Sequence, residues 1–217
     1  MTGTNEALIV VAHPDDETLW AGGTIIDNPS WSWTIVALCR RDDPDRAPRF
    51  ARVLDQLGAT GAMGDLDDGP DQAPLSGDHV VAAVADLLPA RAWARVLTHS
   101  PFGEYTRHRR HEEVSRAVVS LWRRGTITAG EIFLFAYEDG GRTYLPRAVE
   151  RADQVTALDD NTFSRKYGLI TNTYGFAPDS WEARATPRTE AFWRFESATG
   201  YDAWLRSEEV LQGRDNR

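Results

Sequence analysis

The stretch ALIVVAHPDDE at positions 7–17 decides the fold and carries the first candidate site. Its first half, Ala7–Ala12, is a short apolar run, which predicts a strand buried on both faces. Its second half places ionisable side chains directly after that strand: His13, Asp15, Asp16 and Glu17. Because the carboxyl ends of strands form the ligand crevice in open α/β sheets, these side chains emerge where a site would be built.

Outward from this stretch, apolar runs alternate with amphipathic segments. Further strands are predicted at Trp33–Leu38, Ala59–Leu66, Arg95–Thr98 and Ile132–Tyr137, and helices at Glu17–Ile26, Arg46–Leu57, Asp78–Leu88 and Arg110–Trp122. The alternation predicts an α/β doubly wound domain, a parallel sheet with helices on both faces.

The last third of the chain is less regular. Gly140-Gly141 predicts a turn, after which Arg142–Ala148 returns as a short strand. Helices are predicted at Thr162–Tyr174 and Tyr201–Leu211. We therefore expect a single domain over residues 1–217, with a motif-bearing core of about 5–140 and a less regular part at 141–217.

Composition excludes several classes of protein. The chain has 217 residues, of which 41% are hydrophobic and 26% are charged. This composition is typical of a globular protein and excludes a disordered or fibrous one. Its net charge of −9 repels phosphate backbones, so we expect no nucleic-acid partner. The lone Cys39 excludes an internal disulfide and a cysteine metal cluster, and it is expected to be a buried strand residue. Without a signal-peptide or membrane-spanning run, the chain is expected to be cytoplasmic; the sequence leaves open whether it forms a homo-oligomer.

The block that follows the first strand predicts a metal site. Its ionisable groups beside an apolar strand would be costly without a compensating partner, and a divalent cation is the simplest one. His13 and Asp16, three apart as a helix begins, can converge on one point, with Asp15 beside the metal but not bound to it. The alternative is that Asp15 or Asp16 caps the helix, which explains one carboxylate but not the histidine.

A second block, THSPFGEYTRHRRH at positions 98–111, supplies another pair of histidines. His108 and His111 stand three apart at a helix start, and His111 continues the apolar stripe through Val114 and Val118. A lone histidine there would usually be a satisfied core residue, but the pair together with the first block predicts ligation. His13, Asp16 and His111 would leave an open position for water, as in catalytic zinc sites; the same set could hold iron(II) for oxygen chemistry.

These two blocks resemble those of the PIG-L/LmbE-like metal-dependent de-N-acetylases. They occur in the family's order, and the resemblance extends over roughly the first 140 residues. The resemblance implies a Rossmann-like sheet and a Zn²⁺ ion held by His13, Asp16 and His111. It also implies that Asp15 is the general base and that His108 assists as a cation or proton donor.

Further roles follow from the same resemblance. In some members a tyrosine polarises the amide carbonyl; Tyr105 is the nearest match, three residues before His108 where the commoner pattern has two. Arg46 and Asp67 align with positions that contact substrate in mycothiol-type members, although Arg46 could equally be a solvated helix residue and Asp67 a turn former. The implied reaction removes an N-acetyl group from a small-molecule N-acetylglucosamine conjugate.

Other readings remain open from the sequence. Within the family, an amidase acting on a thiol or other acyl conjugate would use the same chemistry. A Ser-His-Asp hydrolase could use Ser100, but the chain lacks the G-x-S-x-G elbow there. A non-catalytic nucleotide-binding protein would share the fold type, yet Gly22-Gly23 falls too late to hold a pyrophosphate. Aromatic residues of Asp139–Arg147 and Tyr174–Trp181 could line the mouth of the site or pack the core.

Overall fold

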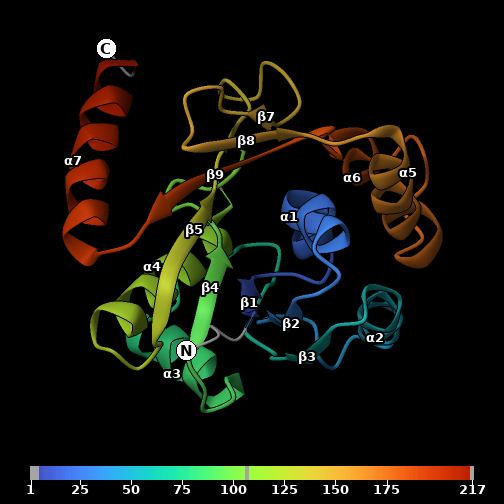
Figure 1. The fold of residues 1–217 in the computed structure, drawn as a ribbon, viewed down its shortest axis with the longest axis horizontal. Coiled ribbons are helices and arrows are strands. Elements are labelled where there is room, and N and C mark those ends of the chain that lie inside the picture. Colours follow the sequence, from blue (N-terminus) through green and yellow to red (C-terminus); the bar gives the residue numbers. More distant parts are fainter. Residues whose placement is uncertain (1–4, 106–107, 216–217) are drawn as a thin grey trace.

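The computed structural model describes residues 5–105 and 108–215, and it contains a seven-stranded mixed sheet in the order β3-β2-β1-β4-β5-β9-β8 (Figure 1). Five strands are mutually parallel: β1 (Glu6–Val11), β2 (Ser32–Ala37), β3 (Thr60–Met63), β4 (Trp93–Thr98) and β5 (Ala129–Phe135). Two more strands continue the sheet: β9 (Thr189–Phe195) pairs antiparallel with β5, and β8 (Gln154–Ala157) pairs antiparallel with β9. A separate short pair joins β6 (Tyr137–Glu138) to β7 (Arg147–Ala148).

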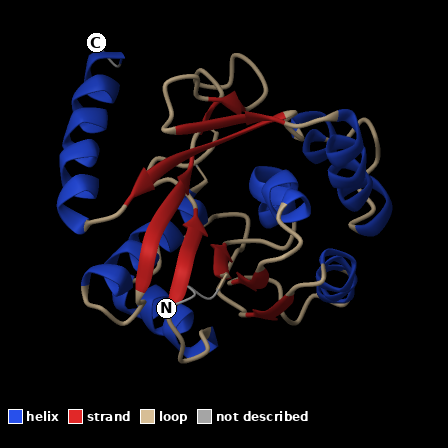
Figure 2. Ribbon diagram, viewed as in Figure 1, coloured by secondary structure: helices blue, strands red, loops and turns tan. Residues whose placement is uncertain are grey.

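Helices cover both faces of this sheet (Figure 2). One face carries α3 (Gly77–Leu87), α4 (Arg109–Arg123) and α7 (Ala198–Asp215). The other carries α1 (Asp16–Asp27), α2 (Arg46–Leu57), α5 (Asp160–Gly168), the π-helix η1 (Leu169–Thr173) and α6 (Trp181–Ala185). Within the described part of the chain, no helix combines the length and apolar character that crossing a bilayer requires.

The central strand β1 shows why the sheet is sandwiched. Leu8 and Val10 pack into the hydrophobic core beneath α3 and α4, while Ile9 and Val11 pack into the core beneath α1 and α2. All four side chains are completely buried. Because side chains alternate between the faces of a strand, an apolar run is what a doubly covered strand requires. The predicted α/β doubly wound fold is confirmed.

Cys39 lies just beyond β2 and is fully buried, as predicted, although outside the strand. Its backbone N–H donates to the carbonyl of Ala12, so it continues the pairing of β2 with β1. Burial raises the pKa of its thiol, which therefore stays protonated and unreactive.

The structure differs from the predictions mainly after residue 140. The strands β8 and β9 were not predicted, because Glu190 and Arg194 interrupt the apolar pattern of β9. The buried Glu190 is instead satisfied by the amide of Gly23 and by Lys166. The helix predicted at Thr162–Tyr174 divides into α5 and η1, and only Arg147–Ala148 of the expected strand at 142–148 forms.

The strand order reverses at β1, which has β2 on one side and β4 on the other. At such a reversal the connections leave in opposite directions and open a crevice at the carboxyl ends of the two strands. The His13 block follows β1 and the His108–His111 block follows β4, so the fold brings both to that crevice.

Candidate metal centre

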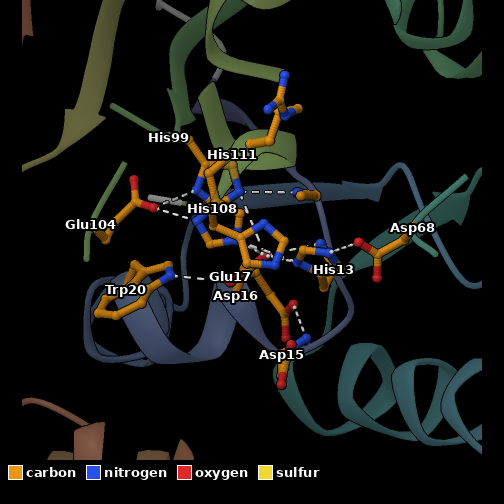
Figure 3. Close-up of polar contacts among 12 residues, drawn as sticks. His13, Asp15, Asp16, Glu17, Trp20, Asp68, His99, Glu104, His108 and His111 are labelled. Carbon is orange, nitrogen blue, oxygen red and sulfur yellow. Dashed lines mark hydrogen bonds and ion pairs between the residues drawn. The ribbon is translucent and has the colours of Figure 1, made fainter. Parts of the chain in front are cut away.

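The turn between β1 and α1 directs two adjacent carboxylates to different places. Asp15 has a φ of 123°, outside the helical region, and α1 begins at Asp16. The Asp16 carboxylate accepts the backbone N–H of His13 at 2.9 Å and the indole N–H of Trp20 at 3.2 Å. Asp15 instead points away from the histidine cluster that surrounds Asp16 (Figure 3).

Three ligand-type atoms meet beside Asp16. Its Oδ2 lies 3.1 Å from His13 Nδ1 and 3.3 Å from His111 Nε2, and the two histidine nitrogens are 3.3 Å apart (Figure 3). Nitrogen and oxygen atoms bound tetrahedrally to one zinc ion at about 2.0–2.2 Å stand about 3.3–3.6 Å from one another. The triangle formed by His13, Asp16 and His111 therefore fits a zinc ion with only a slight expansion.

A carboxylate lies beside the outer nitrogen of each of these histidines, with a hydrogen bond at His111 and an ion pair at His13. His111 Nδ1 donates to Glu104 Oε2 at 2.6 Å, and His13 Nε2 lies 3.2 Å from Asp68 Oδ1. Arg40 holds Asp68 in turn, at 2.7 Å. With the outer nitrogens protonated, the inner nitrogens have free lone pairs, which is the arrangement that metal-binding imidazoles require.

A third histidine, His99, braces this arrangement. The backbone N–H of Ala12 donates to His99 Nε2 at 3.0 Å, and His99 Nδ1 donates to Glu104 at 3.0 Å. The His99 ring stacks on that of His111, with centroids 3.9 Å apart. Burial lowers the pKa of His99, but Glu104 and Asp16 raise it to about 9. We take His99 as neutral nevertheless, because the Ala12 N–H occupies the lone pair that a second proton would need.

Without a metal, electrostatic attraction to the Asp16 carboxylate holds His13 and His111 beside it. Burial opposes ionisation of Asp16, but the charge of His111 and hydrogen bonds with His111 and His13 hold the pKa of its carboxyl well below the usual range. Burial likewise lowers the pKa of His13, but hydrogen bonds with Asp16 and Asp68 raise it to about 9. A proton thus occupies the place where a cation fits, and a bound cation would displace it.

Asp15 has a different environment from Asp16. Burial and the neighbouring Asp16 charge raise the pKa of Asp15 well above its usual range, while Arg46, 3.7 Å away, opposes that rise. The Asp15 side chain makes no capping bond to α1; its backbone N–H donates to the buried Glu17 carboxylate instead. The helix-cap reading of the acidic block therefore does not describe this turn.

His108 precedes α4 and lies against the triangle, its ring nitrogens close enough to those of His13 and His111 to share an ion. Gln72 accepts the backbone N–H of Arg109 through its oxygen, so its amide nitrogen donates to His108 Nε2 at 3.0 Å. Burial and the charges of His111 and His13 lower the pKa of His108 to about 3. In this state His108 is a neutral imidazole, so of the two roles that the resemblance implies, cation or proton donor, it could fill the second.

These groups line a cavity of about 240 Å³, whose wall includes Asp15, Arg46, Asp68, Tyr105 and His108. Asp67 does not line it. Its side chain is 64% exposed and lies 3.7 Å from Arg110, on the other side of the loop. The neighbouring Asp68 lines the cavity instead, and the substrate-contacting role of Asp67 stays a prediction.

Ser100, the candidate nucleophile of the alternative hydrolase, has a structural role. Its hydroxyl accepts the backbone N–H of Phe102, and its own N–H donates to Glu104. Both bonds hold the turn that presents Glu104 to the histidines. The structure therefore favours a loop residue at this position over a nucleophile.

Unusual backbone conformations gather around the cavity. Within the described ranges, the residues other than glycine with positive φ are Asp15, Arg40, Gln72 and Arg142. The first two line the cavity and Gln72 contacts His108. Such conformations cost on the order of 1–3 kcal/mol each and cluster where function demands a particular side-chain direction.

Comparisons with known proteins agree with this architecture. No family model matches the chain. It is 21% identical over 185 residues to the uncharacterized protein L374 of Acanthamoeba polyphaga mimivirus, covering 76% of each chain. Among solved structures it resembles the N,N′-diacetylchitobiose deacetylase of Pyrococcus horikoshii, with a TM-score of 0.65, 14% identity and coverage of 88% of this chain and 84% of the other.

It also resembles GalB, the 4-carboxy-2-hydroxymuconate hydratase of Pseudomonas putida KT2440, with a TM-score of 0.57, 17% identity and coverage of 83% and 82%. The chain therefore has the α/β fold of the PIG-L/LmbE-like deacetylases. Since the same fold carries a hydratase, the fold by itself does not define the reaction.

Proposed function

We propose that the protein is a metal-dependent hydrolase that removes an N-acetyl group from an N-acetylglucosamine-type conjugate. The observation that carries the proposal is the triangle of His13 Nδ1, Asp16 Oδ2 and His111 Nε2, with sides of 3.1–3.3 Å. Three protein ligands with room for water are typical of catalytic zinc sites. The two sequence blocks and the deacetylases of the same fold support the choice of reaction.

Zinc at this position would supply a Lewis acid that lowers the pKa of bound water from 15.7 to about 7. Asp15 lies beside the triangle, in the same cavity but outside the set of ligands. Its raised pKa suits a carboxylate that accepts the proton of the attacking water and passes it to the departing amine. Water oxygen bonds to the carbonyl carbon, the C–N bond breaks, and acetate and a free amine result.

Two further side chains would bind the carbonyl oxygen as negative charge develops on it. Burial raises the pKa of Tyr105 well above its usual range, so its hydroxyl remains a donor. Neutral His108 accepts from Gln72 through Nε2 and retains a proton on Nδ1 that it can donate. A well-placed donor of this kind contributes about 3–4 kcal/mol to the stability of the transition state.

Arg46 is the candidate for holding the substrate. Its guanidinium lies 4.3 Å from the centroid of the Phe176 ring, which fixes its direction. Its Nη1 is buried in the cavity and has no hydrogen-bond partner among the described residues. The carboxylate of Asp15, 3.7 Å from Nη1, is too distant for a hydrogen bond, so a substrate oxygen could accept one from this buried donor.

Three alternatives remain distinct from this proposal. An amidase acting on a thiol or other acyl conjugate would use the same residues on a different acyl group. Iron(II) could take the place of zinc in the same triangle, since imidazole and carboxylate ligands suit both ions. A hydratase, as in GalB, would add water without releasing acetate.

The test combines metal analysis with an acetate-release screen over N-acetylglucosamine, its disaccharide and other N-acyl conjugates. We expect about one zinc per chain and release of acetate from at least one amino sugar. His13→Ala and His111→Ala should each lose the metal, while His79→Ala, at an exposed position of α3, should retain it. Full zinc occupancy in the purified His13→Ala or His111→Ala variant would refute the ligand set.

A further inference from the structure

Glu17 is a buried carboxylate for which the proposed reaction has no direct use. It lies in the first turn of α1, directly after Asp16, and it is completely shielded from solvent. Its oxygens accept three hydrogen bonds, from the backbone N–H of Asp15 at 3.0 Å, the hydroxyl of Thr18 at 2.6 Å and the hydroxyl of Tyr174 at 2.6 Å. A buried carboxylate is costly unless its partners satisfy it, so these partners indicate what Glu17 holds in place.

The Asp15 N–H is the contact that links Glu17 to the reaction (Figure 3). Asp15 has a φ of 123° and a ψ of −29°, a costly conformation for a residue with a Cβ. Its carbonyl accepts the N–H groups of Thr18 and Leu19 while its own N–H donates to Glu17, so its backbone is held from both ends. The turn directs the Asp15 carboxylate into the metal cavity and away from the ligand triangle. Glu17 therefore fixes the direction of the group proposed to accept the proton of water.

The hydroxyl of Tyr174 fixes Glu17 in turn. The last torsion of a glutamate side chain is soft, so its carboxylate keeps one orientation only where its partners impose it. Thr18 is the next residue in the same helical turn and moves with Glu17, whereas Tyr174 comes from a distant part of the chain. The Tyr174 side chain is 2% exposed and packs in the core beneath α1 and α2. It therefore anchors the turn between β1 and α1 to the C-terminal part of the chain.

The backbone around Tyr174 has its own supports. The π-helix η1 ends with the N–H of Tyr174 donating to the carbonyl of Leu169, five residues earlier, at 2.8 Å. A π turn contains one residue more than an α turn and changes the direction in which the next side chain leaves. Arg49 of α2 donates to the Tyr174 carbonyl, and Gly175 permits this approach, because a Cβ there would lie 1.8 Å from Arg49 Nη1. The place of the Tyr174 hydroxyl is thus set by α2 and η1, independently of Glu17.

We propose that Tyr174 is a positioning residue for Asp15 and acts through Glu17. The inference rests on the proposed function, since it concerns the proton acceptor of that reaction. Tyr174 is not among the described residues that line the metal cavity, and its hydroxyl bonds Glu17 and not the ligand triangle. Its removal should therefore lower kcat and leave KM and zinc content unchanged.

The test is Tyr174→Phe, which removes the hydroxyl and keeps the ring. In the zinc-loaded enzyme we expect kcat for acetate release from N-acetylglucosamine to fall about tenfold, within the ~100-fold that a misplacement of about 1 Å can cost. Tyr137→Phe is the matched control, because Tyr137 is also buried and its hydroxyl bonds the same helix at the Trp20 carbonyl. This control should keep the wild-type kcat. Equal kcat values in the two variants would overturn the proposal.

A double substitution separates positioning from a general loss of stability. In Asp15→Asn the carboxylate that Tyr174 is proposed to direct is absent, so adding Tyr174→Phe should change kcat by less than about twofold. A further loss of about tenfold in that background would show that Tyr174 acts independently of Asp15, and the proposal would be wrong.

Hydrogen exchange tests the linkage without any turnover. In the zinc-loaded protein the Asp15 amide, observed by ¹H–¹⁵N NMR, should exchange about tenfold faster in Tyr174→Phe than in wild type. The His13 amide, which donates to Asp16, is the internal control and should keep its exchange rate. Unchanged exchange at Asp15 would refute the linkage through Glu17. If no acetate is released but exchange at Asp15 accelerates, the proposed function fails and the linkage stands.

Discussion

Replacing Glu104 by glutamine tests whether the outer carboxylates control the metal. Glu104 is completely buried and accepts three hydrogen bonds, from His111 at 2.6 Å, His99 at 3.0 Å and the backbone of Ser100 at 2.9 Å. A glutamine in the same place offers an acceptor on one side only. Whichever way its amide turns, the NH2 group faces a donor, and the favourable orientation sacrifices the Ser100 bond to keep both imidazoles bonded.

The size of the effect follows from this geometry. Leaving one buried donor without a partner costs about 1–3 kcal/mol of folding stability. Replacing the anionic partner of His111 by a neutral one makes the imidazole a weaker ligand, and changes of this kind lower metal affinity about 10–100-fold. That range corresponds to about 1.4–2.8 kcal/mol of binding free energy. The zinc ion also becomes a stronger Lewis acid, so the acidic limb of the activity profile should move to lower pH.

The assay is competition for zinc with a chromophoric chelator, alongside thermal unfolding with and without metal. Glu17→Gln is the control, because Glu17 is equally buried and bonds Thr18, Tyr174 and the amide of Asp15 but no histidine. It should lose stability and keep its zinc affinity. If Glu104→Gln binds zinc within about twofold of wild type, the reasoning that Glu104 governs His111 is incorrect.

Three further outcomes are expected. Asp15→Asn should lower turnover about 10²–10⁴-fold while zinc stays near one per chain; loss of the metal would show that Asp15 is a ligand. Although burial raises the pKa of Asp68, His13 and Arg40 lower it to about 2, so the metal-free protein should lose stability as pH falls from about 4 towards 2. Urea unfolding of Asp68→Asn should show a smaller loss over that range, and an equal loss would contradict the assignment. Gly61→Ala should destabilise by about 1–3 kcal/mol in thermal melts, because its Cβ would lie 2.3 Å from the Ile35 carbonyl oxygen, whereas Gly77→Ala meets nothing within 4 Å and should not.

The first half of the fold could be predicted because strands that are buried on both faces appear in the sequence as continuous apolar runs. Ala7–Ala12 and Trp33–Leu38 are continuous apolar runs, and β1 and β2 lie within a residue or two of them. The strand predicted at Ala59–Leu66 forms at Thr60–Met63, and the N–H groups of Gly64 and Leu66 continue its pairing with the β2 segment by donating to the carbonyls of Ala37 and Leu38. The antiparallel strand β9 could not be predicted, since the partner that neutralises Glu190 is Lys166, distant in sequence.

The candidate site was also predicted only in part: the convergence of the proposed ligands was predicted, but the carboxylates around them were not. The spacing of His13, Asp16 and His111 indicated that they converge, and their atoms do lie together. The carboxylates that orient them were missed, although Glu104 lies within the quoted second block. Its role depends on a turn that returns the side chain towards His99 and His111, and residue spacing does not encode that path.

The strand reversal at β1 has a mechanical consequence. The proposed ligands come from two segments that are far apart in the sequence: His13 and Asp16 follow β1, and His111 lies in the first turn of α4. The loop that contains Asp68 and Gln72 lies between these segments along the chain. An ion bound by both segments would act as a removable cross-link at the carboxyl ends of β1 and β4, closing a long loop of chain. Adding metal should therefore slow cleavage by proteases in this loop, and a chelator should restore it, so that limited digestion reports occupancy without any knowledge of the substrate.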